Sequence, residues 1–271
     1  MHGMTFTSTF QAEIPQKFEP YRAFLESNTR RTTLLHLSPV VVDDRDSVPT
    51  KAKANPTGSR IGGPAVVTDN HPWPLDTRDK AMMHLAQINL AEMPIREGYP
   101  TDGLLQFFHA DDEAFGIDHG GNLVRYLPAT ELENSRLEGT LENQSDAIYG
   151  DGYFEVEGQL FDQFPLPSDY QFPEKGFPED SQSLEYGIWD LNQPNNIFGG
   201  GWAYFTQEDP RYDSNLAKSG LELLLQIDST LEADQPIEIM FGDAGVANFF
   251  IHPNDLAKLD FSQVFYTWDC C

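Results

Sequence analysis

The chain repeats itself once along its length. Three short blocks recur in the same order: Gly62–Thr68 returns as Gly200–Thr206, Leu85–Asn89 as Leu224–Asp228, and Gly103–Phe108 as Gly245–Phe250. The residue offsets between the copies are 138, 139 and 142, so only small insertions separate them. A shared offset of this kind restricts the fold to one built from two related halves. We place the first pseudo-repeat at about residues 59–127 and the second at about 197–271.

The segment before the first repeat is expected to hold one helix and one extended stretch. Apolar residues at Phe18, Tyr21, Phe24 and Leu25 have the spacing of one helical face, which predicts a short amphipathic helix within residues 15–26. Residues 32–37 and 40–42 are rich in β-branched and apolar side chains and are predicted to be extended. We treat residues 15–42 as an N-terminal helix and strand.

The rest of the chain is dominated by predicted strands. They are expected at residues 82–90, 123–127, 153–160, 221–227, 237–241, 246–251 and 264–268, with a short helix at 253–259. The four-residue link Gly242–Gly245 predicts a hairpin between the strands on either side of it. Residues 128–196 are rich in Glu, Asp, Gln and Pro but also in aromatic residues, so we expect an irregular middle segment packed on the fold. The predicted fold class is α+β: a strand-rich single compact domain, residues 1–271, with few short helices.

The charge of the chain limits its partners. Forty-three acidic residues against 17 basic ones give a formal net charge of −26, which would repel the phosphate backbone of nucleic acids. The same field would attract a basic protein partner, although an acidic surface also simply keeps a protein in solution. No apolar run reaches the roughly 18–20 residues of a membrane helix, and the N-terminus does not resemble a signal peptide. We therefore expect a soluble, cytoplasmic protein without nucleic-acid or membrane partners.

Metal and cofactor sites find little support in the sequence. The two cysteines, Cys270 and Cys271, are adjacent, which excludes a disulfide framework and a cysteine-based zinc site. The histidines and aspartates of residues 109–112 and 118–119 offer metal-ligand chemistry, but solvated or capping roles are the simpler interpretation. The glycine clusters at residues 62–63 and 199–201 lack the lysine and the spacing of phosphate loops, so they are expected to be backbone turns. We predict no metal and no cofactor.

Two polar features allow either a structural or a functional interpretation. Gln87 and Gln226 occupy matched positions in otherwise apolar strands. Each either ties its strand to the glycine turn of its own repeat or meets the other glutamine in a cleft between the halves. The run Thr206–Arg211 contains an amide, two carboxylates and a guanidinium. Asp209 either caps a turn there and pairs with Arg211, or takes part in acid–base chemistry. Trp202 is expected to close the core of the second half.

Several of these blocks together resemble the YwqG-like family of uncharacterised, mainly bacterial proteins. They are Ser59–Pro64, Trp73–Pro74, Leu85–Asn89, Gly103–Phe108, Phe205–Arg211, Phe241–Gly245 and Trp268–Cys270. The chain departs from the family pattern at residues 201–203, where Gly-Trp-Ala stands in place of the more frequent Gly-Tyr-Pro. The resemblance implies an α+β fold with two related halves built into one body. It carries over no catalytic residue, and it makes an immunity role one hypothesis.

Two functional hypotheses follow. The first is a non-enzymatic protein-binding, immunity or accessory factor that uses its acidic surface, and we lean toward it because the sequence contains no catalytic constellation. The second is an enzyme or small-ligand binder with a site in the cleft between the two halves. The residues predicted to line that cleft are Arg60, Gln87, Gln207, Asp209, Arg211, Gln226 and Asp243.

Overall fold

Two long antiparallel strands form the centre of the fold. The computed structural model describes residues 9–94, 97–118, 121–172, 191, 196–213, 215, 220–230 and 235–271. Strand β2 (Arg30–Val41) pairs with β10 (Gly152–Gln163) along its whole length, from Arg30 opposite Gln163 to Val41 opposite Gly152. In β10, buried Phe154 and Val156 alternate with half-buried Glu155 and Glu157, as expected for a strand with one face on the core.

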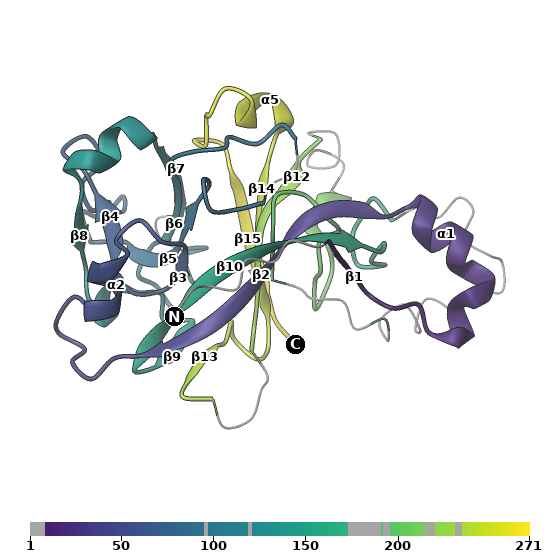
Figure 1. The fold of residues 1–271 in the computed structure, drawn as a ribbon, viewed down its shortest axis with the longest axis horizontal. Helices are drawn as coiled ribbons and strands as arrows, with labels where there is room; N and C mark the ends of the chain where they lie inside the picture. The colour runs from purple at the N-terminus through teal and green to yellow at the C-terminus, as the bar shows by residue number, and fades with distance from the viewer. Residues whose placement is uncertain are drawn as a thin grey trace.

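An arm of four strands extends from each side of this central pair (Figure 1). The first arm consists of β3 (Arg60–Ile61), β5 (Met83–Asn89), β6 (Leu104–His109) and β7 (Asn122–Leu127), and the second of β11 (Ile197–Phe198), β12 (Glu222–Asp228), β14 (Val246–Ile251) and β15 (Phe265–Asp269). The first arm joins the sheet at β10 and the second at β2, and in each arm the strands follow chain order outward. Both β5 and β12 carry a register shift, at residue 85 and at residue 224 respectively.

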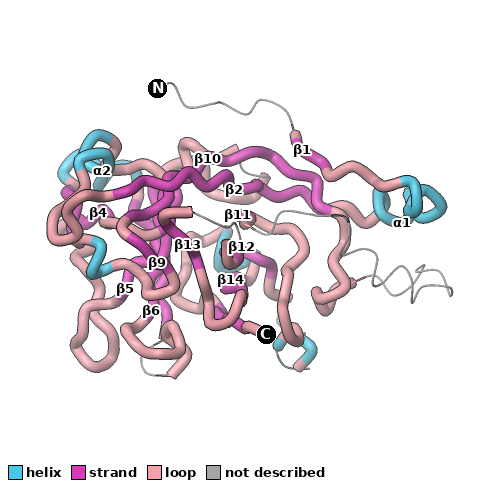
Figure 2. Tube along the Cα trace, turned by 90° about the horizontal axis from the view of Figure 1, so that it is seen from below, coloured by secondary structure: helices cyan, strands magenta, loops and turns pink. Residues whose placement is uncertain are grey.

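The remaining elements cover the sheet or extend from it. They are β1 (Phe10–Gln11), η1 (Gln16–Tyr21), α1 (Arg22–Ser27), α2 (Thr50–Ala54), β4 (Ala65–Val67), η2 (Ala129–Asn134), β8 (Arg136–Glu138), η3 (Leu141–Asn143), β9 (Ile148–Gly150), η5 (Pro210–Tyr212), β13 (Ile237–Ile239) and α5 (Pro253–Leu256). The pairs β4–β8 and β9–β13 form two small separate ladders. Figure 2 shows α1 and α2 at opposite ends of the molecule.

The inner faces of the two arms pack against each other. The ring centroids of Phe107 on β6 and Phe249 on β14 lie 5.0 Å apart, and the ring centroids of Phe115 and Trp268 are also 5.0 Å apart. Because successive side chains of a strand point to opposite faces, the polar neighbours Gln106 and Asn248 lie on the outer faces. Apolar residues of both arms and of the central strands therefore share one core.

The strand-rich fold with few short helices agrees with the sequence analysis. The predicted N-terminal helix is divided into a 3₁₀ turn (η1) and α1, because Pro20 lacks the N–H that a continuous helix needs. The two extended stretches predicted at 32–37 and 40–42 belong to one strand, β2. The middle segment, expected to be irregular, contains β8, β9 and the central strand β10.

The predicted hairpin across Gly242–Gly245 is wrong. A tight turn is present, in which the Gly245 N–H donates to Phe241 O at 2.8 Å. However, β13 pairs with β9, and β14 pairs with β12 and β15. The hydrogen-bonding groups of β13 are used by the middle segment, which a pattern of local turns does not reveal. None of the helices in the described part of the chain has the length and apolar character needed to cross a lipid bilayer.

Candidate functional site

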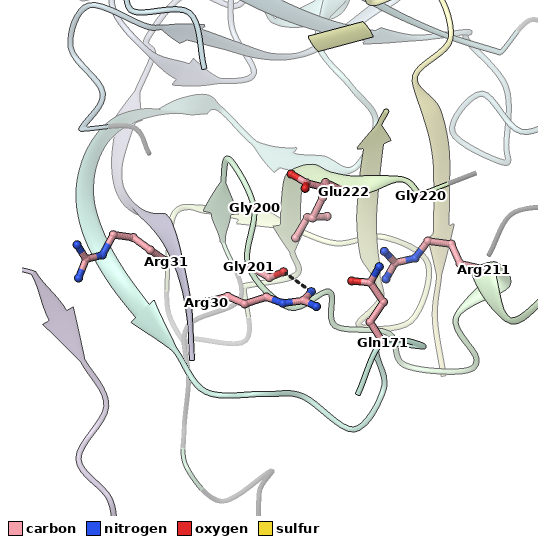
Figure 3. Close-up of a pocket in the computed structure, with 9 residues that line it drawn as sticks. Arg30, Arg31, Gln171, Gly200, Gly201, Arg211, Gly220 and Glu222 are labelled. Atoms are coloured by element: carbon pink, nitrogen blue, oxygen red, sulfur yellow. Dashed lines mark hydrogen bonds between the residues drawn. The ribbon is translucent and has the colours of Figure 1, made fainter. Parts of the chain in front are cut away.

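A polar pocket of about 320 Å³ lies where β2 begins, beside the glycine turn that leads out of β11. It is lined by Arg30, Arg31, Gln171, Gly200, Gly201, Arg211, Gly220, Glu222 and Leu223 (Figure 3). Gly200 and Gly201 adopt φ angles of 92° and 97°, a region that favours glycine. A Cβ at residue 201 would lie 2.6 Å from the Gln163 side-chain oxygen. The turn that shapes the pocket therefore requires glycine at that position.

Arg30 is the first residue of β2 and is largely buried beside Trp202. Its Cζ atom lies 3.5 Å from the centroid of the Trp202 ring, a cation–π contact. The indole is itself held in place, since its N–H donates to Asn28 O at 3.0 Å. Arg30 Nη1 donates to Gly201 O at 3.3 Å. Burial lowers the pKa of Arg30 from its usual value.

Arg211 enters the pocket from the opposite side as part of a buried charged cluster. Its Nη2 atom lies 2.7 Å from Asp209 Oδ2 and 3.0 Å from Asp169 Oδ2. The two carboxylates also accept backbone N–H groups, from Tyr170 at 2.9 Å and from Ala203 at 2.8 Å. Burial lowers the pKa of Arg211, but the two carboxylates outweigh this effect and raise it. The cluster fixes the loop that follows β10 against the loop that follows β11.

The predicted local role of Asp209 is confirmed. Its side chain caps η5 by accepting the Arg211 N–H at 2.8 Å, and it pairs with the guanidinium of the same residue. The same Asp-x-Arg arrangement occurs in the first arm at Asp76 and Arg78. There the Arg78 N–H donates to Asp76 Oδ1 at 2.7 Å, and Arg78 Nη2 donates to Asp76 Oδ2 at 2.6 Å. Arg78 is exposed, whereas Arg211 is buried.

The guanidinium groups of Arg30 and Arg211 point toward each other across the pocket, with the Gln171 amide between them (Figure 3). Arg31 points away and is bound by Asp162, whose oxygens lie 2.7 and 2.9 Å from Nε and Nη2. Glu222 is half-buried at the start of β12. The pocket thus presents guanidinium and amide donors on two sides and a carboxylate on a third.

A family profile described as Domain of unknown function (DUF1963) matches residues 59–270. This match covers most of the chain. The chain belongs to the DUF1963 family. A search of curated proteins finds no relative at a significant level. The name YwqG-like given above stays a resemblance.

The DUF1963 match includes one side of the pocket and excludes the other. Gly200, Gly201, Arg211 and Glu222 lie inside the matched region, whereas Arg30 lies in the N-terminal segment before it. A strand from outside the matched region therefore completes the pocket of this DUF1963 protein.

Arg60 and Gln87, two of the predicted site residues, lie opposite each other on β3 and β5 of the DUF1963 region. Both donate to the carbonyl oxygens of Pro56 and Gly58, at distances of 2.9 to 3.3 Å. Burial lowers the pKa of Arg60. The Oε1 atom of Gln87 accepts the N–H of Val66, so this glutamine ties its strand to the segment after the glycine turn. Gln87 is a buried amide with hydrogen-bond partners, but these lie before and after the glycine turn and not in the turn itself.

The other predicted residues belong to separate networks. Gln226 Oε1 accepts the N–H of Tyr204 at 2.8 Å, again in the segment after the glycine turn of its own arm. Gln207 and Asp243 are exposed near the C-terminus, where Gln207 Nε2 donates to Cys270 O at 2.6 Å and Asp243 O accepts the Cys271 N–H at 3.3 Å. Of the seven predicted residues, Arg211 lines the pocket.

His109, the first residue of the metal alternative, is buried beside Ser145. Its Nε2 atom lies 2.7 Å from Ser145 Oγ, and its Nδ1 atom lies 2.8 Å from Ala110 O, so both ring nitrogens have protein partners. Within the described residues, no three His, Cys, Asp or Glu side chains are placed to hold a metal ion. His119 lies outside the described residues.

The sequence analysis did not identify Arg30, Gln171 or Glu222. Arg30 is about 170 residues from Gly201 along the chain, and no local pattern links the two. One signal was available: Arg30 and Arg31 form a basic pair in a chain with 17 basic and 43 acidic residues. A local excess of positive charge in such a chain marks a position where the charge has a specific use.

Proposed function

We propose that this protein binds a small ligand carrying an anionic group, such as a carboxylate or a phosphate, in the pocket between Arg30 and Arg211. Arg30 carries the argument. A guanidinium has five N–H donors, and the described part of the chain gives Arg30 one hydrogen bond, to Gly201 O. The remaining donors of a largely buried cation face the pocket. A carboxylate or phosphate is the planar or multidentate acceptor that a guanidinium binds best.

The surroundings support a preorganised site. The Trp202 ring fixes the plane of the Arg30 guanidinium, so little side-chain freedom is lost when an acceptor binds. The carboxylates of Asp169 and Asp209 hold Arg211 at the opposite wall. The volume of about 320 Å³ lies at the lower end of the range for small-molecule sites. A large polyanion is disfavoured, because the net charge of −26 would repel it.

The lining favours binding over catalysis. The described residues of the pocket comprise three arginines, three glycines, one glutamine, one glutamate and one leucine. Arg30, Arg211 and Gln171 supply donors for recognition and Glu222 supplies a carboxylate, whereas none of the described lining residues offers a hydroxyl, thiol or imidazole to serve as a nucleophile. The proposal is therefore for a binding protein.

The test compares Arg30→Gln with Arg31→Gln. Thermal unfolding of the wild type is measured in a panel of small carboxylates and in inorganic phosphate, at constant ionic strength, and positive compounds are titrated by calorimetry. We expect at least one anion to bind the wild type and Arg31→Gln, and to bind Arg30→Gln at least tenfold more weakly. Arg31 is the matched control because it is a neighbouring arginine whose side chain points away. Equal binding by Arg30→Gln, or no binding of any anion to the wild type, contradicts the proposal.

A second candidate function is binding of a basic protein partner by the acidic surface, as an immunity or accessory factor in the cytoplasm. The net charge of −26 favours it, because such a field steers a positively charged partner toward the protein. A pull-down from lysate at low and raised salt, followed by mass spectrometry, tests this function. One basic protein captured at low salt and lost at high salt supports it, and a blank at both salts counts against it.

We also infer that the two arms derive from an internal duplication. The support is a hydrogen-bond network present once in each arm, in which a strand amide accepts a backbone N–H and a neighbouring amide donates to the carbonyl of the same residue. Its members are Val66, Gln87 and Gln106 in the first arm and Tyr204, Gln226 and Asn248 in the second.

A further inference from the structure

The matched amide networks of the two arms differ in one respect. In the first arm, Gln106 Nε2 donates to Val66 O at 2.7 Å, and Gln106 Oε1 accepts from Arg125 Nε at 2.8 Å. Arg125 lies directly opposite Gln106 on β7, so a guanidinium completes the network. Asn248 holds the corresponding place in the second arm, where Nδ2 donates to Tyr204 O at 2.9 Å. The residue opposite Asn248 is Thr267, which offers no cation.

Asn248 Oδ1 is consequently a buried acceptor without a donor. The Asn248 side chain is fully buried, and among the residues that the structure describes its Oδ1 atom has no hydrogen-bond partner. An amide oxygen removed from water without a partner is costly, so such an atom marks a place where a donor or a cation belongs.

Two further oxygens without a partner in the described part of the chain belong to a neighbour of Asn248 in the sheet and to the segment that covers it. They are Asp269 Oδ1 and Thr206 Oγ1, both buried atoms. Asp269 follows Thr267 by two residues on β15, so it shares the outer face of the sheet with Asn248 and is its diagonal neighbour. Thr206 belongs to the segment that covers this face. That segment is held on both sides of Thr206: Asn248 Nδ2 donates to Tyr204 O, and the Gln207 N–H donates to Asp269 Oδ2 at 2.7 Å.

The spot beside Asn248 carries a negative charge of its own. Asp269 is one of its three residues, and a carboxylate favours a cation beside it.

We propose that Thr206, Asn248 and Asp269 form a site for a monovalent cation, such as Na⁺, K⁺ or ammonium, which takes the place that the Arg125 guanidinium has in the first arm. The donor set is all oxygen: one carboxylate, one amide carbonyl and one hydroxyl. Hard cations prefer such ligands. A single carboxylate balances a single positive charge, whereas calcium sites usually collect six to eight oxygens, often with more than one carboxylate. This site is separate from the Arg30 pocket and does not depend on the proposed function.

The experiment measures the melting temperature of the full chain in the chlorides of sodium, potassium, ammonium and tetramethylammonium, at equal ionic strength. Tetramethylammonium is too large for the site and sets the baseline. We expect at least one small cation to raise the melting temperature by about 2 to 4 °C, because a ligand bound only to the folded state stabilises it. Equal melting temperatures in all four salts overturn the proposal. Magnesium and calcium chloride are added as two further salts, and a rise in these two alone overturns the proposal as well.

Two variants connect the effect to these residues. Thr267→Arg supplies a guanidinium opposite Asn248, as Arg125 does opposite Gln106, and is expected to remove the cation dependence. Asp269→Asn removes the negative charge, is expected to remove the dependence too, and serves if the arginine variant does not fold. A cation response that persists in Asp269→Asn contradicts the proposal. In crystals grown with rubidium, an anomalous peak between the three oxygens supports the site, and an ordered water there overturns it.

Discussion

The ring of Phe107 packs edge-to-face against the ring of Phe249, with their centroids 5.0 Å apart and their planes inclined by 69°. The two residues belong to the blocks that recur at an offset of 142, so the same position of each block meets in the centre of the core. This pair joins the two arms of the sheet. Its geometry is the favoured one for aromatic pairs, in which the edge of one ring faces the electron-rich face of the other.

Phe107→Ala is expected to lower the free energy of unfolding by about 3–5 kcal/mol, because it leaves a cavity between the arms. The measurement is urea unfolding followed by tryptophan fluorescence. The double variant with Phe249→Ala isolates the contact, and a coupling energy of about 0.5–1.5 kcal/mol is expected between the two rings. Additive effects of the two substitutions would show that the rings do not interact.

Gln226→Ala is expected to destabilise the protein by about 1–3 kcal/mol, because the N–H of Tyr204 loses its acceptor. Gln87→Ala should behave in the same way through Val66. Gln207→Ala is the matched control: its side chain is exposed, so its effect should stay within about 0.5 kcal/mol. Chemical denaturation of the three variants provides the comparison. A decrease in the free energy of unfolding for Gln207→Ala as large as that for Gln226→Ala would contradict this account.

Gly201→Ala should be more damaging than Gly98→Ala. Both glycines have φ angles near +100°, so both alanines carry the strain of that conformation. At residue 201 the new Cβ would also lie 2.6 Å from Gln163 Oε1, which accepts the Trp202 backbone N–H, whereas at residue 98 no atom of the described residues lies within 4 Å. The difference between the two melting temperatures therefore measures the close packing under the pocket. An equal decrease in melting temperature for the two variants would show that the turn at Gly201 relaxes to accept a side chain.

Stability is expected to fall as the pH decreases below about 6.5, in part because of His84. Burial lowers the pKa of His84 from its ordinary value of 6.5 to about 3 in the folded protein. Between these values the unfolded chain binds a proton that the folded protein does not, so the free energy of unfolding decreases by about 1.4 kcal/mol per pH unit. The contribution is present in full above pH 6.5. His84→Gln should reduce the dependence of the free energy of unfolding on pH by about 1.4 kcal/mol per pH unit, the contribution of one proton. Denaturation at several pH values measures this slope. An unchanged slope would show that His84 is protonated in the folded state.

The sequence predicted those features that depend on local pattern or on the repeat. A polar residue at matched positions in apolar strands predicted that both glutamines have hydrogen-bond partners in their own half, although these lie after the glycine turn and not in it, and the cap by Asp209 followed from its place before a proline. The pairing of β13 with β9 did not follow, because it joins residues about 90 apart whose local sequence suits a hairpin equally well. The pocket did not follow from the sequence either. Arg30 and Trp202 meet only because β2 and the turn after β11 are neighbours in the sheet.

The position of β2 between the two arms has a practical consequence for anyone who prepares the matched region by itself. A shortened chain starting at residue 59 would lose the strand that pairs with both β10 and β11. Two rows of backbone donors and acceptors, one of them twelve residues long, would then become free edges in the middle of the sheet. Edges of that length recruit strands from other molecules. Such a fragment is expected to aggregate, and to recover when a peptide spanning residues 30–41 is added.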